Sequence, residues 1–180
     1  MSTTETVLLI GVSILGAVVV MLAFDRYRSR RLRSQFGPEY ERTLREHGDL
    51  TKAEKDLAQR RRRVAKLNIR PLSTPDHDRF VAAWRADQAK FVDDPAGAVS
   101  KADRLVQELM VARGYPVADF DQRVEDISVD HPFLVRNYIA ARQIAMREGS
   151  GQSSTEDLRQ ALVHYRGLFD ELLERQEATK

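Results

Sequence analysis

The chain of 180 residues contains no cysteine. This absence excludes disulfide bonds, thiolate nucleophiles and zinc sites built on cysteine, and it fits a reducing compartment. The sequence also has no HExxH, GxSxG or dinucleotide-binding glycine fingerprint, which mark common hydrolases and nucleotide enzymes. No stretch alternates polar and apolar residues for long enough to predict a convincing β-strand. We therefore predict an all-α fold and no cofactor or metal site.

Charged side chains are missing from one long stretch, residues 6–24. The 18 residues from Val7 to Phe24 would span roughly 27 Å as a helix at about 1.5 Å per residue, close to the ~30 Å hydrocarbon core of a bilayer. A cleaved signal peptide is the alternative. It needs a basic start and a small-residue cleavage site, whereas no basic side chain precedes the run and Met21 stands near its exit. The sequence therefore predicts a retained transmembrane helix.

A cluster of five arginines follows the uncharged stretch directly: Arg26, Arg28, Arg30, Arg31 and Arg33. Each would cost about 2.5 to 3.5 kcal/mol at the centre of a membrane, so the cluster sets the end of the span. By the positive-inside rule this end is cytoplasmic. We predict a single-pass protein of the plasma membrane, with residues 1–5 outside and everything after the span in the cytoplasm.

Small residues within the predicted span allow a second interpretation. Gly11, Ser13, Gly16 and Ala17 would let two such helices approach closely, which would make a homo-oligomer. Small residues are also common in single spans, so a helix that faces lipid is the more usual explanation.

Residues 25–69 form a basic segment, with 14 basic and 7 acidic side chains, whereas residues 70–180 have 15 basic and 19 acidic ones. Leu50, Leu57 and Val64 recur every seven residues, which predicts a helical stalk with one narrow apolar stripe. Gly48 interrupts the stalk and Thr51 with Glu54 forms a capping-box pattern, which fits either one kinked helix or two helices.

Within the stalk stand four consecutive arginines, Arg60, Arg61, Arg62 and Arg63. They are a candidate site for a polyanion, either nucleic acid or anionic lipid. A solvated helix with acidic neighbours is the commoner explanation, and residues 50–69 around these arginines have no aromatic platform for bases, so nucleic acid is disfavoured.

Residues 70–177 contain repeated signals of helix starts and ends, which predict a helical domain. Residues 178–180 are predicted to form a tail. Helix starts are predicted where a capping residue precedes a proline or an acid, at Thr74–Pro75, Asp94–Pro95, Asp130 to Pro132, and Ser154–Asp157 or Ser153–Glu156. One helix end is predicted at Gly114, which is followed by Pro116. Apolar residues recur with helical spacing between these signals. The helix from Thr74 is expected to continue through Phe91, and the last helix carries Leu162 in its apolar stripe. The sequence therefore predicts a bundle of about four or five helices.

Several stretches resemble a group of uncharacterised bacterial proteins. They are FGPEYERTLRE (36–46), FVDDP (91–95), RGYP (113–116), SVDHP (128–132) and STEDLRQALVHYRGLFDELL (154–173). The resemblance covers nearly the whole chain from Arg26 onward. It implies one N-terminal membrane span, a helical cytoplasmic region and a bacterial origin. It implies no catalytic residues.

Three groups of polar residues are candidate sites, and each has a structural alternative. Asp76, His77 and Asp78 have the side chains of metal ligands, but neighbours on a helix point in different directions, so an acidic cap is the commoner explanation. Asp130 and His131 resemble a base and its orienting acid, yet they stand where a helix would start. His164 is most simply an isolated surface histidine.

These patterns favour a non-catalytic, membrane-anchored helical module that presents a cytoplasmic surface to an unknown protein partner, with the bilayer itself bound through residues 6–24. The first alternative is a membrane-linked binder of nucleic acid or anionic lipid that acts through the arginine-rich stalk. The second is a hydrolase. It would need the histidines and acids to converge in one concave pocket.

Overall fold

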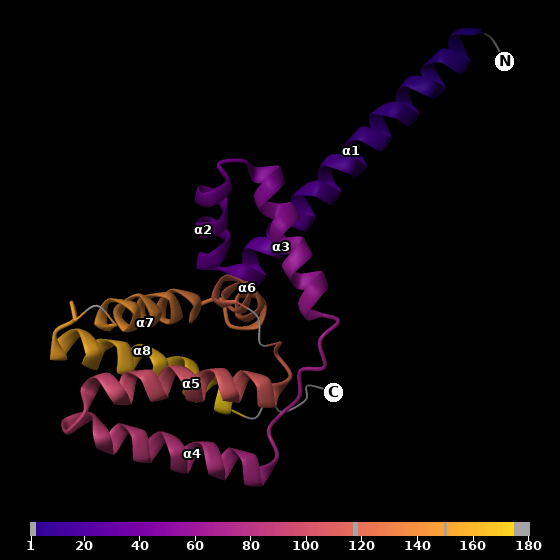
Figure 1. Cartoon of the computed structure of the whole chain (residues 1–180). Helices are drawn as coiled ribbons and strands as arrows, with labels where there is room; N and C mark the ends of the chain where they lie inside the picture. Colours follow the sequence, from indigo (N-terminus) through magenta and orange to yellow (C-terminus); the bar gives the residue numbers. More distant parts are fainter. Residues whose placement is uncertain (1–2, 117–118, 150, 175–180) are drawn as a thin grey trace. The chain divides into compact units, whose positions relative to one another are not determined.

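The structure is a computed structural model of the whole chain, and it describes residues 3–116, 119–149 and 151–174; the side chains of residues 3–10 and 12–14 lie outside this description. All regular structure in the described ranges is helical, which confirms the predicted all-α class (Figure 1). The chain divides into two compact units, residues 1–58 and 59–180, and the division falls within one helix. The predicted tail at residues 178–180 lies outside the described ranges.

The first unit consists of α1 (Thr3–Phe36), α2 (Pro38–His47) and the first part of α3 (Leu50–Val64). The break after α1 lies at Gly37, whose φ of 47° suits a residue without Cβ, and Pro38 starts α2. Gly48 ends α2 in a left-handed conformation, with its N–H donating to the carbonyl of Leu44. The stalk therefore contains two helices rather than one kinked helix.

A hydrogen bond joins α2 to α3 within this unit. The hydroxyl of Tyr40 donates to Oε1 of Glu54 at 2.8 Å. The pKa of Tyr40 is raised to about 12, mainly by burial and secondly by this bond to a carboxylate. Asp49 accepts from the backbone N–H of Lys52 at the start of α3, so Asp49 occupies the place that the sequence pattern suggested for Thr51.

Helix α1 runs without interruption through the uncharged stretch and the arginine cluster. Within the described part of the chain, no helix has both the length and the apolar character that crossing a membrane requires. This finding gives the predicted transmembrane helix no support. Much of residues 6–24 has side chains outside the description, so the span stays a prediction.

Besides the end of α3, the described part of the second unit contains five α-helices and one short 3-10 helix. In chain order they are α4 (Thr74–Ala89), η1 (Lys90–Val92), α5 (Pro95–Arg113), α6 (Phe120–Asp130), α7 (Val135–Glu148) and α8 (Thr155–Leu173). Helix α8 packs against both α5 and α7, and α4 packs against α5 (Figure 1). The predicted boundary after Ile69 lies in the non-helical segment between α3 and α4.

The core of the second unit is formed by one apolar face of each helix. Tyr165, Leu168 and Phe169 of α8 are almost fully buried, as its apolar periodicity predicts. The ring of Trp84 stacks on Phe169, with ring centroids 4.6 Å apart and an interplanar angle of 18°. This stacking fixes α4 against α8.

Most local helix signals are confirmed. Asp94 accepts from the N–H of Gly97 at the start of α5, and Ser154 with Asp157 forms a complete capping box on α8. Gly114 ends α5 with a φ of 96°. At α4 the cap is Ser73 rather than Thr74, since the Ser73 hydroxyl accepts from the N–H of Asp76.

Two predicted boundaries are wrong. Asp130 to Pro132 does not start a helix; α6 continues to Asp130, and α7 begins at Val135 after a turn. The reason is burial, because Ile127 and Val129 carry α6 into the core just before this point. The helix expected to run through Phe91 instead ends at Ala89, and η1 follows with a tighter winding.

Candidate docking groove

Helix α8 has a second face beside its core stripe. Arg159, Leu162, Val163 and Arg166 recur at the spacing i, i+3, i+4 and i+7, which places them along one side of the helix. On the facing segment, Trp84, Gln88, Phe91 and Val92 follow a similar spacing across α4 and η1. The two rows of residues are parts of the same unit, and each extends over about two helical turns.

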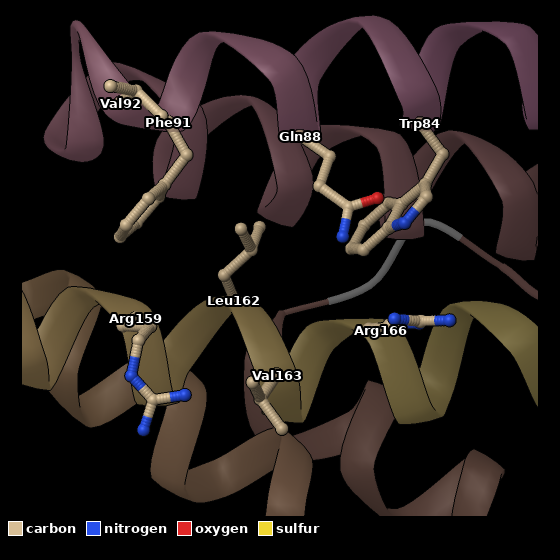
Figure 2. A pocket seen from close by; sticks show the side chains of 8 residues that line it. All are labelled: Trp84, Gln88, Phe91, Val92, Arg159, Leu162, Val163 and Arg166. Carbon is tan, nitrogen blue, oxygen red and sulfur yellow. The ribbon is translucent and has the colours of Figure 1, made fainter.

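These eight residues line an open groove with a volume of about 230 Å³, hereafter the α4–α8 groove. Figure 2 shows Leu162 pointing from α8 toward the opposite wall, where Trp84, Gln88 and Phe91 project toward it. Trp84 is 6% exposed and Leu162 is 8% exposed, so they form the floor. The floor is held rigidly because Trp84 is stacked on Phe169.

The rim of the groove exposes apolar side chains. Val92 is 86% exposed and Val163 is 55% exposed. Single exposed apolar residues are normal on a protein surface, but here two of them border a concave apolar floor. Because η1 follows directly on α4, Val92 lies at the mouth of the groove rather than in the core.

The charged groups that line the groove are cationic. Arg159 forms two hydrogen bonds of 2.7 Å to Glu156, and Arg166 contacts Asp170 at 3.3 Å; all four side chains are more than half exposed. The bonds from Arg159 lower the pKa of Glu156 to about 2. No carboxylate is among the eight residues that line the groove. Its charged rim therefore suits an acidic ligand.

The four consecutive arginines have different surroundings. Arg60 is 4% exposed and lies 3.7 Å from Oε1 of Glu125. Arg63 contacts Oε2 of Glu125 and Oδ1 of Asp126, each at 2.7 Å. These two arginines therefore hold the end of α3 to α6 within the second unit, and only Arg61 and Arg62 remain as the basis of the polyanion hypothesis. Binding of a polyanion by Arg60 to Arg63 stays a prediction.

The arginines that the sequence assigns to membrane orientation all lie in α1 and are exposed: Arg26, Arg28, Arg30, Arg31 and Arg33. Arg33 pairs with Glu41 of α2. Their role in orienting a span stays a prediction.

Asp76, His77 and Asp78 are engaged in local contacts at the start of α4. The Ser73 hydroxyl donates to Oδ2 of Asp76 at 2.7 Å, and this bond lowers the pKa of Asp76. Nδ1 of His77 lies 3.1 Å from Oδ1 of Asp78. Over the part of the chain that the structure describes, no three histidine, aspartate or glutamate residues gather as a metal site would require. The geometry at these residues is that of a helix start.

Asp130 and His131 have separate partners. The hydroxyl of Tyr115 donates to Oδ2 of Asp130 at 2.8 Å, whereas Nδ1 of His131 lies 3.2 Å from Oε1 of Glu171. His131 is 5% exposed, and its Nε2 is enclosed without a hydrogen-bond partner among the residues that the structure describes. A general base must reach its substrate, and an enclosed imidazole does not. This geometry argues against the hydrolase hypothesis.

His164 lies on α8 and is half-buried. The other two candidate histidines belong to different parts of the chain, since His77 lies in α4 and His131 follows α6.

Tyr165, the neighbour of His164, belongs to a buried polar network that the sequence did not reveal. The Tyr165 hydroxyl donates to Oδ1 of Asp103 at 2.9 Å, and Arg142 and Gln107 donate to Oδ2 of the same carboxylate. Burial raises the pKa of Tyr165 well above its usual range. The network joins α5, α7 and α8 and has a structural role.

The α4–α8 groove was not predicted. The sequence placed Leu162 in the core stripe and Phe91 in a continuous helix, and it assigned Val92, Val163 and Arg166 to no site. A usable signal was present in the spacing of Arg159, Val163 and Arg166, which forms a second row beside the core stripe of α8. The facing row was concealed because it crosses from α4 into η1.

No family model matches the chain, and comparisons with curated proteins and with solved structures likewise found no match.

Proposed function

We propose that this protein is a non-catalytic helical module, anchored in a membrane, that binds another protein through the α4–α8 groove. The observation that carries this proposal is the groove itself, a concave apolar floor with exposed valines at its mouth. An exposed apolar surface of this kind loses contact with water when a partner protein covers it, which favours association. The volume of about 230 Å³ is below the roughly 300 to 1,000 Å³ of pockets that enclose a small ligand, and this favours a protein partner over a cofactor.

The anchor is part of the same proposal. Apolar side chains of α1, among them Leu15, Met21 and Phe24, are at least half exposed to solvent, and they need cover from lipid or protein. The arginine cluster that follows would place the second unit in the bacterial cytoplasm. Since the chain has no cysteine, one engineered thiol at a time can report the topology.

Topology is tested with two single-cysteine variants of the full chain, Ser2→Cys and Ser100→Cys, and a thiol reagent that does not cross membranes. Ser100 is exposed in the second unit and serves as the matched position. We expect labelling at position 2 in intact cells, and labelling at position 100 only after permeabilisation. The reverse pattern would exclude the proposed orientation, and equal labelling of both in intact cells would exclude the anchor.

Partner binding is tested with a photo-crosslinking amino acid in place of Val92, in the full chain and in living cells. Val111 on α5 is the matched control, because it is also an exposed valine of the second unit but does not line the groove. We expect a discrete crosslinked species from position 92 that position 111 does not give. No adduct at position 92, or the same adducts at both positions, would contradict the proposal.

A further inference from the structure

We infer that the partner segment in the α4–α8 groove is an amphipathic helix whose apolar side chains are flanked by carboxylates. This inference rests on the proposed function and specifies the chemistry of the partner.

The size and shape of the groove argue for side chains projecting from a helix. Because the groove is open and holds about 230 Å³, it accommodates a few side chains rather than a whole ligand. Its two walls run along α4–η1 and α8, each over about two turns, or roughly 10 Å. A helix that presents apolar residues at i, i+3 or i+4 and i+7 offers a ridge of this length.

The polar groups of the groove argue for carboxylates on that helix. Arg159 and Arg166 are seven residues apart on one face of α8, so their positions differ by about 10.5 Å along the axis. The remaining polar lining residue, Gln88, is exposed and can donate or accept. Two acidic residues seven apart on a partner helix would meet both guanidinium groups. A basic helix would meet like charges instead.

Exchange of ion-pair partners is feasible at this site. The present partners of the arginines, Glu156 and Asp170, lie on the same helix at spacings of three and four residues. Exposed pairs of this kind are weak, because water screens them and the long side chains lose freedom. A partner carboxylate that takes the place of Glu156 or Asp170 therefore has to displace only a weak contact.

A nucleic acid or lipid surface fits the groove less well. The tryptophan of the groove, Trp84, forms the buried floor and presents no face on which a base could stack. Its two arginines stand beside carboxylates of the same helix, whereas an anionic membrane is bound by clusters of several basic residues.

The test uses a phage-displayed library of helical peptides with leucine at i, i+4 and i+7 and with flanking positions varied among Glu, Gln and Lys. Selection is made on the full chain in detergent, in parallel with the charge-reversed variant Arg159→Glu/Arg166→Glu. We expect the wild-type chain to enrich Glu over Lys at the flanking positions, and the variant to enrich Lys over Glu. Unchanged enrichment in the variant, or no acidic preference in the wild type, overturns the inference.

Binding in the groove is verified by fluorescence, because Trp84 is the single tryptophan of the chain and lines the groove. Titration of a selected acidic peptide should shift the Trp84 emission, and Arg159→Gln/Arg166→Gln should weaken its affinity on the order of tenfold. Peptides that bind without affecting Trp84, or with equal affinity to this variant, overturn the inference. The inference is also overturned if the Trp84 emission changes with the anionic lipid content of reconstituted vesicles in the absence of peptide.

These outcomes can be separated from failure of the proposed function. Crosslinks from position 92 that persist in Arg159→Glu/Arg166→Glu would leave the groove as a protein-binding site and remove the acidic helix. Absence of groove-specific crosslinks in the wild-type chain would remove the proposed function itself.

Discussion

Two regions of the second unit contain similar residue types, but one is a buried junction and the other is an open groove. At the junction of α5, α6 and α8, hereafter the closed junction, Arg113 donates to two backbone carbonyls, Tyr115 donates to Asp130, and His131 contacts Glu171. In the α4–α8 groove, the ion pairs that the arginines form among the described residues are with exposed carboxylates of their own helix. The first region draws its hydrogen-bond partners from distant parts of the chain, although Nε of Arg113 and Nε2 of His131 are enclosed without one among the described residues. The second keeps apolar and cationic surface open to solvent.

The comparison teaches that burial separates the two roles better than residue type does. Arg113 is 1% exposed and lies among the most buried large side chains, whereas Arg159 and Arg166 are exposed. A buried arginine that caps the end of a helix contributes to folding, because the last carbonyls of a helix have no donor within the helix itself. An exposed arginine beside an apolar hollow is available to a partner.

The largest effect is expected at the closed junction from Arg113→Met, which keeps the apolar length of the side chain but removes its charge. Nη1 of Arg113 lies 2.7 Å from the carbonyl oxygen of Leu172 and 3.2 Å from that of Glu174. Since each carbonyl left without a donor costs about 1 to 3 kcal/mol, the free energy of unfolding should fall by roughly 3 to 4 kcal/mol. Urea unfolding followed by Trp84 emission measures it. A loss below about 1 kcal/mol would show that the junction is not structural.

A somewhat smaller effect is expected from Arg63→Gln. Asp126 is 1% exposed, and Arg63 is its cationic partner at 2.7 Å. Because an uncompensated buried carboxylate destabilises the fold, we expect the free energy of unfolding to fall by about 2 to 3 kcal/mol at neutral pH, less than for a pair buried on both sides. The double variant Arg63→Gln/Asp126→Asn should recover at least half of this loss. Equal losses in the single and double variants would disprove the role of the ion pair.

The same pair gives a pH dependence with a defined sign. Burial raises the pKa of Asp126 above its usual value of about 3.9, and Arg63 opposes the rise. With a raised folded-state pKa, the stability gained from protonation is present below the unfolded-state pKa and is lost as pH rises through the folded one. Arg63→Gln removes the opposing charge, so its deficit should be small near pH 4 and complete at pH 7. Asp126→Asn should abolish this difference.

A backbone effect distinguishes two glycines with left-handed conformations. A Cβ at Gly114 would lie 2.2 Å from the carbonyl oxygen of Asn68, whereas one at Gly48 would meet nothing within 4 Å. Both alanine variants incur about 1 kcal/mol for the positive φ, and Gly114→Ala also displaces backbone. We expect Gly114→Ala to lower the thermal midpoint clearly more than Gly48→Ala, with an additional loss of about 1 to 2 kcal/mol. Equal shifts would mean that the approach to Asn68 is relaxed at no cost.

The closed junction and the groove also differ in what the sequence could reveal. The caps at Asp94 and Ser154 and the helix end at Gly114 were predicted correctly, because their partners lie within a few residues. Asp130 and His131 were misplaced at a helix start, because their partners, Tyr115 and Glu171, are 15 and 40 residues away. Local sequence patterns predict hydrogen bonds between residues that are close in the chain. They do not indicate which distant side chain forms a pair with a given residue.

The arginine run shows the same limit. Four consecutive charges look equivalent in the sequence, yet Arg60 and Arg63 face Glu125 while Arg62 is exposed, since residues three apart share a face of α3 and their neighbours do not. The groove was missed for a different reason. Its walls combine two segments about 75 residues apart in the chain, and the turn at η1 that places Val92 at the mouth depends on packing.

The smallest effect on stability is expected in the groove, where the effect on binding should be large. Val163 is 55% exposed in the middle of α8, and Val111 is 47% exposed in the last turn of α5. Val163→Asp and Val111→Asp should each lower the free energy of unfolding by less than about 1 kcal/mol, with Val111→Asp the less stable of the two because its carboxylate lies at the negative end of the helix dipole. With the crosslinking residue at position 92, Val163→Asp should reduce adduct formation at least tenfold, because it places a charge on the apolar rim, and Val111→Asp should leave it unchanged. If both variants reduced adducts alike, the groove would have no special role; if neither did, Val92 would contact its partner from outside it.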